Sequence, residues 1–424
     1  MLAALLHTLV QTPSELSPPP SPQASLETAD HPVELRTLNF DMAQSCEPHE
    51  PRVLKKQISG RTPVNLGQER DIWKPLVQST TNLSEVHSIR SVFEFRTFDP
   101  EGAIFYGDTK DGEDWFMLSL KDGIPEMQIS KEGTIVSVAG GPKLNDGKWH
   151  LLELSNQGKF VILEVDRAKA LVVGLGSNGA DDLLSGQIRL ALGGVLIDTK
   201  KMIVQFQPQM DGCVQEGSWL NLTAPWETEA EELWPCYQNI QPGSYFPGTG
   251  FAVFNTSVFS RDAEQDGLKI EIWGHFSQMD GTILSMKAPG QELLLALEAD
   301  NNTKAVTLTF GNDKIMMAED FNRLALIFQK DLLEVLMEND QSEARRLSVA
   351  SEEQPAYLGT LAGGRLAIGG LLGEGEEHVG SHYLTGCLQK IQVQGKDLDL
   401  DLAVKHASVS SYSCPAEIMK GHID

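Results

Sequence analysis

The chain has 424 residues, of which 41% are hydrophobic, and its formal net charge is -25 at pH 7. This length predicts two or three domains with sizeable cores. The acidity, without any cluster of Lys and Arg, argues against nucleic acid as a partner; it fits a solvated acidic surface and also a protein that binds calcium.

The first part of the chain shows no regular hydrophobic pattern. Residues 1–10 are apolar, but they lack a basic start and a convincing cleavage site, so they make a poor signal peptide. Residues 14–24 are rich in Ser and Pro, as disordered segments often are. We therefore expect residues 1–65 to form a disordered or atypical N-terminal segment. No stretch reaches about 18 uninterrupted apolar residues, so no membrane span is predicted.

From Ser91 onward the sequence has the pattern of short β-strands. Phe93 and Phe95 alternate with polar residues, which is typical of a half-buried strand. Further apolar runs are separated by Gly- and Asp-rich turns; they lie at Ala103–Tyr106, Trp115–Leu120, Trp149–Leu154 and Phe160–Val165. Strands of this length with almost no helical stretch predict an all-β sandwich.

One sequence motif occurs twice in the chain. Arg189–Leu196 reads Arg-Leu-Ala-Leu-Gly-Gly-Val-Leu and recurs, slightly changed, at Arg365–Leu372 about 175 residues later. Because this spacing suits whole domains, we expect two tandem copies of one fold. The strands of the second copy are expected at Lys269–Trp273, Gly281–Leu284, Leu293–Leu297 and Leu324–Phe328. The predicted divisions are a first domain at 66–238, a linker at 239–248, a second domain at 249–416 and a tail at 417–424.

Four of the five cysteines stand at matching places in the two copies. We expect one disulfide per domain, Cys213–Cys236 and Cys387–Cys414, each stabilising its domain by roughly 3 kcal/mol. Cys46 is left over. Asn-x-Ser/Thr glycosylation sequons stand at Asn82, Asn221, Asn255 and Asn301. Together the disulfide pattern and the sequons favour secretion.

Motifs of enzyme chemistry are missing from the sequence. Gly174, Gly176 and Gly179 match the dinucleotide-binding pattern G-x-G-x-x-G, but that pattern works only where a helix begins at the glycines. Only a few residues separate these glycines from the next expected strand, so a flexible loop is the better interpretation. Nothing pairs a nucleophile with a base, so we predict that the chain is not an enzyme.

Two carboxylates stand out at Asp99 and Glu101. Residues i and i+2 of an extended segment point the same way, so both side chains can reach one hard cation such as calcium. An ordinary acidic turn is the alternative. The corresponding stretch of the second copy keeps only Asp280, so we assign any calcium to the first copy. Asp114 precedes two aromatic residues; it either fixes the polar end of a ligand or belongs to a turn before a core strand.

Several segments together resemble the sex hormone-binding globulin family, whose members carry tandem laminin G-like domains. The resemblance is specific in the first domain and looser in the second, and it covers roughly residues 66–414. It rests on Phe93–Gly102, Ile104–Thr109, Asp114–Leu118, Asp146–His150 and Leu190–Gly194. It implies two jelly-roll sandwiches, the first of which holds one steroid between its sheets.

The resemblance also implies roles for particular residues. Ser91 matches a serine that hydrogen-bonds the oxygen on the steroid A ring, and Asp114 matches an aspartate that receives the D-ring hydroxyl. Phe116, Leu154 and Ile188 match apolar wall positions. The calcium ligands correspond to Asp99, Glu101 and the backbone carbonyl of Gln209, and the glycine-rich loop at 179–186 corresponds to a mobile cover of the pocket.

The sequence departs from the family pattern at three places. Lys131 replaces an asparagine beside the D-ring aspartate, and Asn156 replaces a methionine that lines the pocket, so both residues bear on steroid preference. The two histidines of the mammalian zinc site correspond to Glu132 and Ser185, so no zinc is predicted.

These features lead to two alternative functions. The first is extracellular transport of sex steroids, androgens or estrogens, by a glycoprotein that the resemblance implies is a homodimer. A second is a calcium-dependent laminin G-like adhesion or receptor-ligand module. In either case the second domain can contact a cell-surface or matrix protein.

Overall fold

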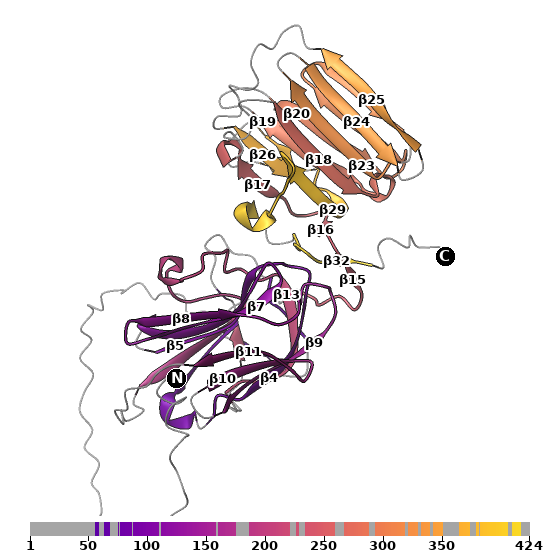
Figure 1. The fold of residues 1–424 in the computed structure, drawn as a ribbon. Helices are drawn as coiled ribbons and strands as arrows, with labels where there is room; N and C mark the ends of the chain where they lie inside the picture. Colours follow the sequence, from indigo (N-terminus) through magenta and orange to yellow (C-terminus); the bar gives the residue numbers. More distant parts are fainter. Residues whose placement is uncertain are drawn as a thin grey trace, which may run out of the picture.

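In the residues that it describes, the computed structural model of the chain consists mainly of β-strands, and the helical elements there are short 3-10 turns (Figure 1). The residues that it describes are 56–58, 63–67, 75, 77–86, 88–109, 112–157, 160–174, 186–220, 226–228, 234–258, 267–287, 293–318, 321–329, 332–339, 342–350, 364–373, 379–380, 382–405 and 409–416. Cys46, Asn221, Ser185 and most of the glycine-rich loop lie outside them.

The first domain is a sandwich of two antiparallel sheets. Its eight-stranded sheet runs, in spatial order, β1 (Lys56–Ile58), β14 (Trp226–Thr228), β3 (Val77–Asn82), β12 (Gln187–Leu192), β5 (Gly102–Thr109), β6 (Asp114–Lys121), β7 (Ile124–Lys131) and β8 (Thr134–Ala139). The six-stranded sheet runs β11 (Ala168–Gly174), β10 (Phe160–Val165), β9 (His150–Gln157), β4 (Ser91–Thr97), β13 (Gly212–Ser218) and β2 (Val64–Asn65).

The second domain repeats this plan. One sheet runs β16 (Ser244–Pro247), β29 (Thr385–Val393), β18 (Leu268–Gly274), β23 (Arg323–Gln329), β24 (Leu332–Asn339) and β25 (Ser342–Ala350), with β30 (Lys396–Asp397) beside β29. The facing sheet runs β22 (Asp313–Met317), β21 (Ala305–Phe310), β20 (Leu293–Asp300), β19 (Gly281–Lys287), β26 (Arg365–Ile368), β17 (Ala252–Asn255) and β31 (Val404–Lys405).

Short elements complete the part of the chain that the structure describes. β15 (Ile240–Gln241) pairs with β32 (Cys414–Pro415), and β27 (Leu371–Leu372) pairs with β28 (Val379–Gly380). The 3-10 turns are η1 (Leu83–Glu85), η3 (Thr199–Lys201), η4 (Thr256–Val258), η5 (Phe276–Gln278) and η6 (Leu400–Leu402). None of the helices among the described residues is long and apolar enough to cross a membrane.

Alternation of side chains along the strands explains where the cores lie. In β4, Ser91, Phe93 and Phe95 face the space between the sheets, whereas Val92 and Glu94 are partly exposed. In β6 the inward residues include Phe116 and Leu118; the alternate residues Trp115 and Met117 belong to a second cluster on the outer face of the same sheet. The first domain therefore buries both faces of its larger sheet, and the facing sheet covers only the inner one.

The predicted strands agree with the structure. Each apolar run named for the first domain lies in β5, β6, β9 or β10, apart from Trp149, and those of the second copy lie in β18, β19, β20 and β23. The all-β sandwich class is confirmed, as are the two disulfides, whose cysteines are 23 and 27 residues apart. Both disulfides close a loop near the end of a domain.

Both domains begin earlier in the chain than the sequence indicates. β1 and β2 fall within residues 1–65, yet β1 pairs with β14 and β2 pairs with β13 of the first domain. The expected linker at 239–248 contains β15 and β16, and β16 pairs with β29 of the second domain. Strands of two to four residues are too short to produce a visible hydrophobic period, so sequence patterns do not reveal them.

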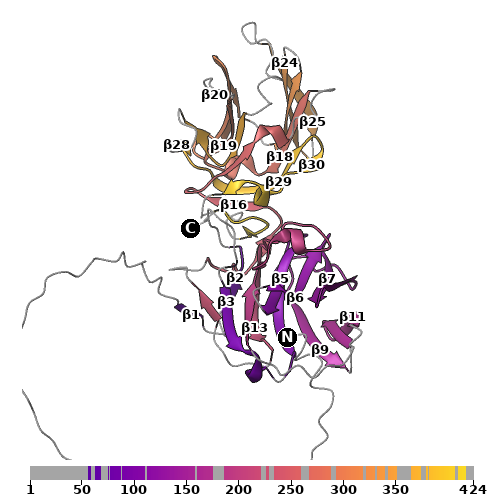
Figure 2. The same ribbon diagram turned by 90° about the vertical axis from the view of Figure 1, so that its left-hand side faces the viewer.

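The two domains lie one beyond the other (Figures 1 and 2), and the chain passes from the first to the second close to Arg96. The buried guanidinium of Arg96 donates to the backbone carbonyls of Tyr237 and Gln238, and it lies 4.6 Å from the centre of the Trp149 ring. Tyr237 in turn makes an edge-on contact with Tyr245 of β16. Arg96 thereby fixes the point at which the chain leaves the first domain.

Candidate functional site

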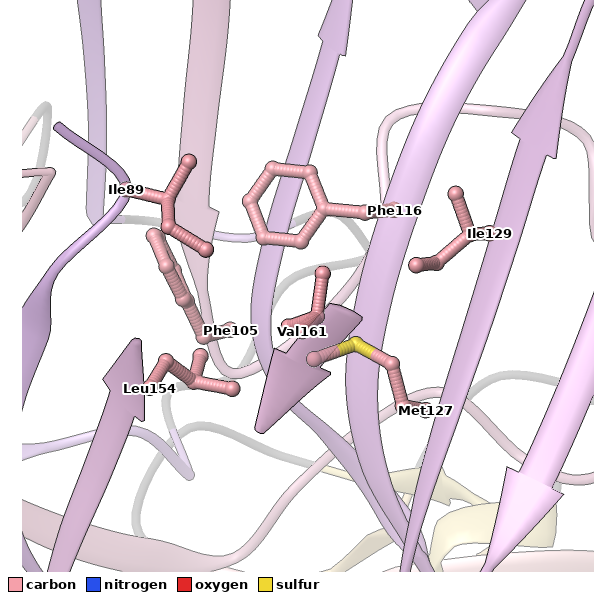
Figure 3. Close-up of a pocket in the computed structure, with 7 residues that line it drawn as sticks. All are labelled: Ile89, Phe105, Phe116, Met127, Ile129, Leu154 and Val161. Carbon is pink, nitrogen blue, oxygen red and sulfur yellow. The ribbon is translucent and has the colours of Figure 1, made fainter. Parts of the chain in front are cut away.

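An apolar pocket lies between the two sheets of the first domain. Seven side chains line it, from both sheets and from the segment before β4, and they point toward one another (Figure 3): Ile89, Phe105, Phe116, Met127, Ile129, Leu154 and Val161. It leaves only about 10 Å³ for the centre of a water molecule, whereas pockets for small molecules usually span roughly 300–1,000 Å³. The pocket is therefore almost closed as it stands, and its lining residues are all apolar.

Aromatic rings continue from the pocket into the core. Phe116 meets Phe105 edge-on, and Phe105 meets Trp219 in the same way, with ring centroids 5.1 and 4.9 Å apart. Trp219 stacks on Phe93 at a centroid distance of 4.3 Å. Rigid rings packed in this way keep one side of the pocket in a fixed shape.

Ser91 lies at the edge of this pocket. It is the first residue of β4 and faces its cross-strand partner Leu154, which is a lining residue. Its side chain is fully buried. Ser91 Oγ donates to the backbone carbonyl of Ile89 at 3.2 Å and accepts from the backbone N–H of Leu220 at 2.9 Å. The predicted ligand-binding serine is therefore the polar side chain placed beside the apolar wall.

The remaining residues predicted to bind a ligand lie on strands of both sheets. Asp114 is the first residue of β6, and its Oδ1 accepts from the backbone N–H of Glu132 at 2.8 Å. It lines an open groove with Trp115 and Glu132 and is not among the residues that line the apolar pocket. Because Trp115 pairs with Ser130, Lys131 lies across from Asp114. Ile188 is fully buried in the same core. Asn156 follows Leu154 by two residues in β9, which places it on the same face.

Five of the seven lining residues were not predicted from the sequence. Phe105, Met127, Ile129 and Val161 occupy inward positions of strands, so the period of two assigns them to the core but does not separate a pocket wall from solid packing. Ile89 comes before β4 and carries no strand signal. These residues differ from ordinary core residues only because the facing sheet leaves a gap next to them, and tertiary packing determines where that gap lies.

A second cluster consists of carboxylates between the domains. Oxygens of Asp99 and Asp211 in the first domain and of Asp401 in the second lie within 4.8 Å of one another. Both oxygens of Asp99 accept backbone hydrogen bonds, from Glu101 and from Asp211. Burial raises the pKa of Asp99 well above its usual range, and the neighbouring carboxylates of Asp401 and Asp211 raise it further.

The other predicted calcium ligands belong to the two segments that meet at Asp99: Glu101 follows Asp99 by two residues, and Gln209 precedes Asp211 by two. The carboxylate of Glu101 pairs with the ammonium of Lys121. The carbonyl of Gln209 approaches the backbone at Gly102, where a Cβ atom would lie only 2.4 Å from it. These oxygen donors are the kind that calcium prefers, so the residues present fit the ion. Asp211 and Asp401 were not predicted, because no pattern in the sequence links either of them to Asp99, and Asp401 belongs to the second domain.

Three of the predicted glycosylation sites are on the surface. The side chains of Asn82, Asn255 and Asn301 are exposed. Glu132, to which the family resemblance assigns one of the two zinc positions, is exposed as well.

Comparison with known proteins defines the class of this fold. Residues 95–224 match the family described as "Laminin G domain". Domains LG4-5 of the mouse laminin alpha1 chain superpose with a TM-score of 0.57 over 88% of this chain and 97% of that one, at 16% identity. The two sandwiches are thus a tandem laminin G-like pair.

Sequence similarity narrows this class further. Sex hormone-binding globulin of Homo sapiens is 32% identical over 346 residues, covering 81% of this chain and 84% of that protein. The Phodopus sungorus protein is 31% identical with the same coverage. Growth arrest-specific protein 6 of Mus musculus is 25% identical over 89% of this chain and 57% of its own length. The chain belongs to the sex hormone-binding globulin family.

Proposed function

We propose that this chain carries sex steroids outside the cell and holds one molecule in the pocket between the sheets of its first domain. The observation that supports this most directly is the apolar wall around Phe116 and Leu154, with the hydroxyl of Ser91 at its edge. This is a binding role and not a catalytic one.

The energetics suit a rigid apolar ligand. A steroid presents roughly several hundred Å² of apolar surface, and its burial at about 25 cal/mol per Å² yields on the order of 10 kcal/mol before association costs. A fused ring system loses little conformational entropy, so a Kd near 1 nM, about -12 kcal/mol, is reachable. Because the pocket is narrow, ligand entry has to widen it by repacking flexible side chains such as Met127.

Equilibrium binding of labelled dihydrotestosterone and estradiol to the full chain tests this proposal. We expect saturable nanomolar binding, which Ser91→Ala and Asp114→Ala each weaken by about tenfold or more, since each leaves a ligand oxygen without its partner. Asp313→Asn, an exposed substitution in the second domain, is the control. Unchanged affinity in both pocket variants would remove the site from this pocket; no binding at all would favour an adhesion or receptor-ligand module.

We also propose that calcium binds at Asp99. The family resemblance supplies Asp99, Glu101 and the Gln209 carbonyl as ligands, and the nearby carboxylates of Asp211 and Asp401 support the proposal. Because Asp401 belongs to the second domain, a cation here offsets the repulsion of carboxylates across the domain boundary. The ion then has a structural role in holding the two domains together.

Thermal unfolding of the full chain with and without calcium tests the cation proposal. We expect calcium to raise the Tm of the wild type by mass action, and Asp99→Asn and Asp401→Asn each to reduce that rise. Asp313→Asn should keep it in full. A rise in Tm that both variants retain would place the calcium elsewhere.

Compartment and assembly complete the proposal. The two disulfides and the exposed sequons at Asn82, Asn255 and Asn301 suit a secreted glycoprotein. Homodimer formation is an expectation drawn from the family, as is contact of the second domain with a cell-surface or matrix protein. Analytical ultracentrifugation of the purified chain, with and without steroid, measures the oligomeric state.

A further inference from the structure

Another pocket, which we call the interdomain cleft, lies between the two domains. Its walls come from β2 and the last segment of the first domain, and from β16 and the chain before β32 in the second domain. Six residues line it: Asn65, Trp234, Pro235, Tyr237, Pro247 and Ser410. It leaves about 160 Å³ for the centres of water molecules. Sites for drug-sized molecules span roughly 300–1,000 Å³, so this cleft suits a single ring.

The walls of the interdomain cleft are held in place by hydrogen bonds and disulfides. The amide of Asn65 donates to the carbonyl of Pro235 at 3.1 Å, and the neighbouring Cys236 is bonded to β13 by the first disulfide. On the other wall Ser410 forms a bridge with Tyr245 of β16, and the second disulfide joins β29, which pairs with β16, to β32. A site whose walls are already ordered loses little conformational freedom when a ligand binds.

Two hydroxyl groups of the lining are available to a ligand. Ser410 is only 7% exposed, yet no hydrogen bond among the described residues uses its hydroxyl. The same holds, within the described part of the chain, for the hydroxyl of the half-buried Tyr237. Because buried hydroxyls in proteins are nearly always paired, these two groups are suited to a ligand that both donates and accepts hydrogen bonds.

The lining also determines which ligands do not fit. None of the six lining residues carries a charge, and the chain as a whole has a formal net charge of -25, which repels anions. A purely apolar ligand would cover the two hydroxyls without bonding them, at a cost of about tenfold in affinity for each. The ligand is therefore uncharged and polar.

A neutral sugar ring has the complementary chemistry. One face of a pyranose ring consists of C–H groups, which pack on aromatic rings such as those of Trp234 and Tyr237. Its hydroxyl groups both donate and accept, as the hydroxyl of Ser410 does. We propose that the interdomain cleft binds one ring of a neutral sugar and that the bound ring contacts both domains. The sugar belongs either to an external glycan or to an N-glycan of the chain itself.

Saturation-transfer NMR on the full chain tests the proposal with named probes. The neutral probes are the methyl glycosides of mannose, galactose and N-acetylglucosamine, and the charged comparison is N-acetylneuraminic acid. We expect saturation of at least one neutral sugar, with a Kd on the order of 1 mM for a single ring. Binding of N-acetylneuraminic acid should be at least about tenfold weaker, since its carboxylate meets no cation in the lining.

Two variants assign the binding to the interdomain cleft. Ser410→Ala removes one hydroxyl and should weaken sugar binding by about fivefold or more. Trp234→Ala removes an aromatic ring on which the sugar packs and should weaken binding by about tenfold or more. The matched control is Ser119→Ala, which removes a fully buried hydroxyl of β6 that bonds the Glu126 carbonyl; it should bind sugar as the wild type does.

The outcomes also distinguish the source of the sugar. Binding of a free sugar only after enzymatic removal of N-glycans would assign the cleft to a glycan of the chain itself, whereas equal binding before and after removal would assign it to an external glycan. No saturation of any neutral sugar, or saturation that Ser410→Ala and Trp234→Ala both leave unchanged, would overturn the proposal. If Trp234→Ala does not fold, the comparison of Ser410→Ala with Ser119→Ala decides the result.

Discussion

The two domains share one fold but differ at the place where the first has its pocket. Gly102 pairs with Leu120 in the first domain and Gly281 pairs with Ala299 in the second, and this fixes the correspondence. Counting from these pairs, Phe116 corresponds to Leu295, and its partner Ile129 corresponds to Phe310.

The sheets that contain β4 and β18 also carry smaller or polar residues in the first domain and larger apolar ones in the second. Ser91 opens β4 opposite Leu154, whereas Leu268 opens β18 opposite Phe328. Phe310 and Phe328 come from facing sheets, and their rings meet edge-on with centroids 6.4 Å apart. In the second domain, Phe310 and Phe328 thus fill the space that the smaller Ile129 and Leu154 leave open in the first domain. Leu268 stands there in place of the polar Ser91. The same fold therefore contains either a pocket or a solid core, depending on which residues occupy a few inward-facing positions.

The largest expected effect on stability comes from truncating Phe310, one of the two phenylalanines that fill the core of the second domain. Phe310 is 5% exposed, and Phe310→Ala should lower the free energy of unfolding of that domain by about 3–5 kcal/mol, because it leaves a cavity between the sheets. Urea unfolding of the full chain measures the loss. Steroid affinity should not change; a large fall in affinity would contradict the separation of the two cores.

Placing two phenylalanines at the corresponding positions of the first domain should abolish steroid binding. In Ile129→Phe with Leu154→Phe, the new rings occupy the pocket, so steroid affinity should fall by at least about a hundredfold, roughly 2.8 kcal/mol. Thermal unfolding checks that the domain still folds, since overpacking costs about 1–3 kcal/mol. The matched control is Phe310→Ile with Phe328→Leu, which should bind as the wild type does.

A smaller effect of pH should belong to the first domain. His150 lies between Asp166 at 2.8 Å and Asp146 at 3.0 Å. Partial burial raises the pKa of Asp146, but hydrogen bonds from Lys148 and His150 outweigh it and bring the pKa to about 2. A lowered pKa in the folded state adds stability that is present above the ordinary value near 4 and disappears as the pH falls toward 2.

The variant Asp146→Asn should therefore lose less stability than the wild type between pH 5 and pH 2.5. Because 37% of the Asp146 side chain is exposed to solvent, screening should keep the difference below about 1 kcal/mol. Urea unfolding at the two pH values measures it. Equal losses in both proteins would show that Asp146 does not contribute to the acid response.

The comparison also shows what a sequence can and cannot reveal. Period-two alternation located β4, short apolar runs located β6 and β9, and the repeated cysteines located both disulfides. The residues of the pocket wall, such as Met127 and Val161, have the same pattern as ordinary core residues. Only the spacing between facing strands distinguishes them, and that depends on residues far apart in the chain.

The acidic cluster illustrates the same limit over a longer distance. Asp99 and Glu101 stand two residues apart and are visible as a pair. Asp401 follows some 300 residues later, on η6 of the second domain, and it reaches Asp99 only because the domains meet there. A contact across a domain boundary depends on how the two domains pack, and no local pattern records that.

Hydrogen exchange of the full chain, with and without saturating estradiol, tests the central claim most directly. The account predicts ligand-dependent protection in β4, β6, β7 and β9 of the first domain, and none in β18, β20, β21 and β23 of the second. Protection in the second set of strands, or no protection in the first set at saturating steroid, would contradict it.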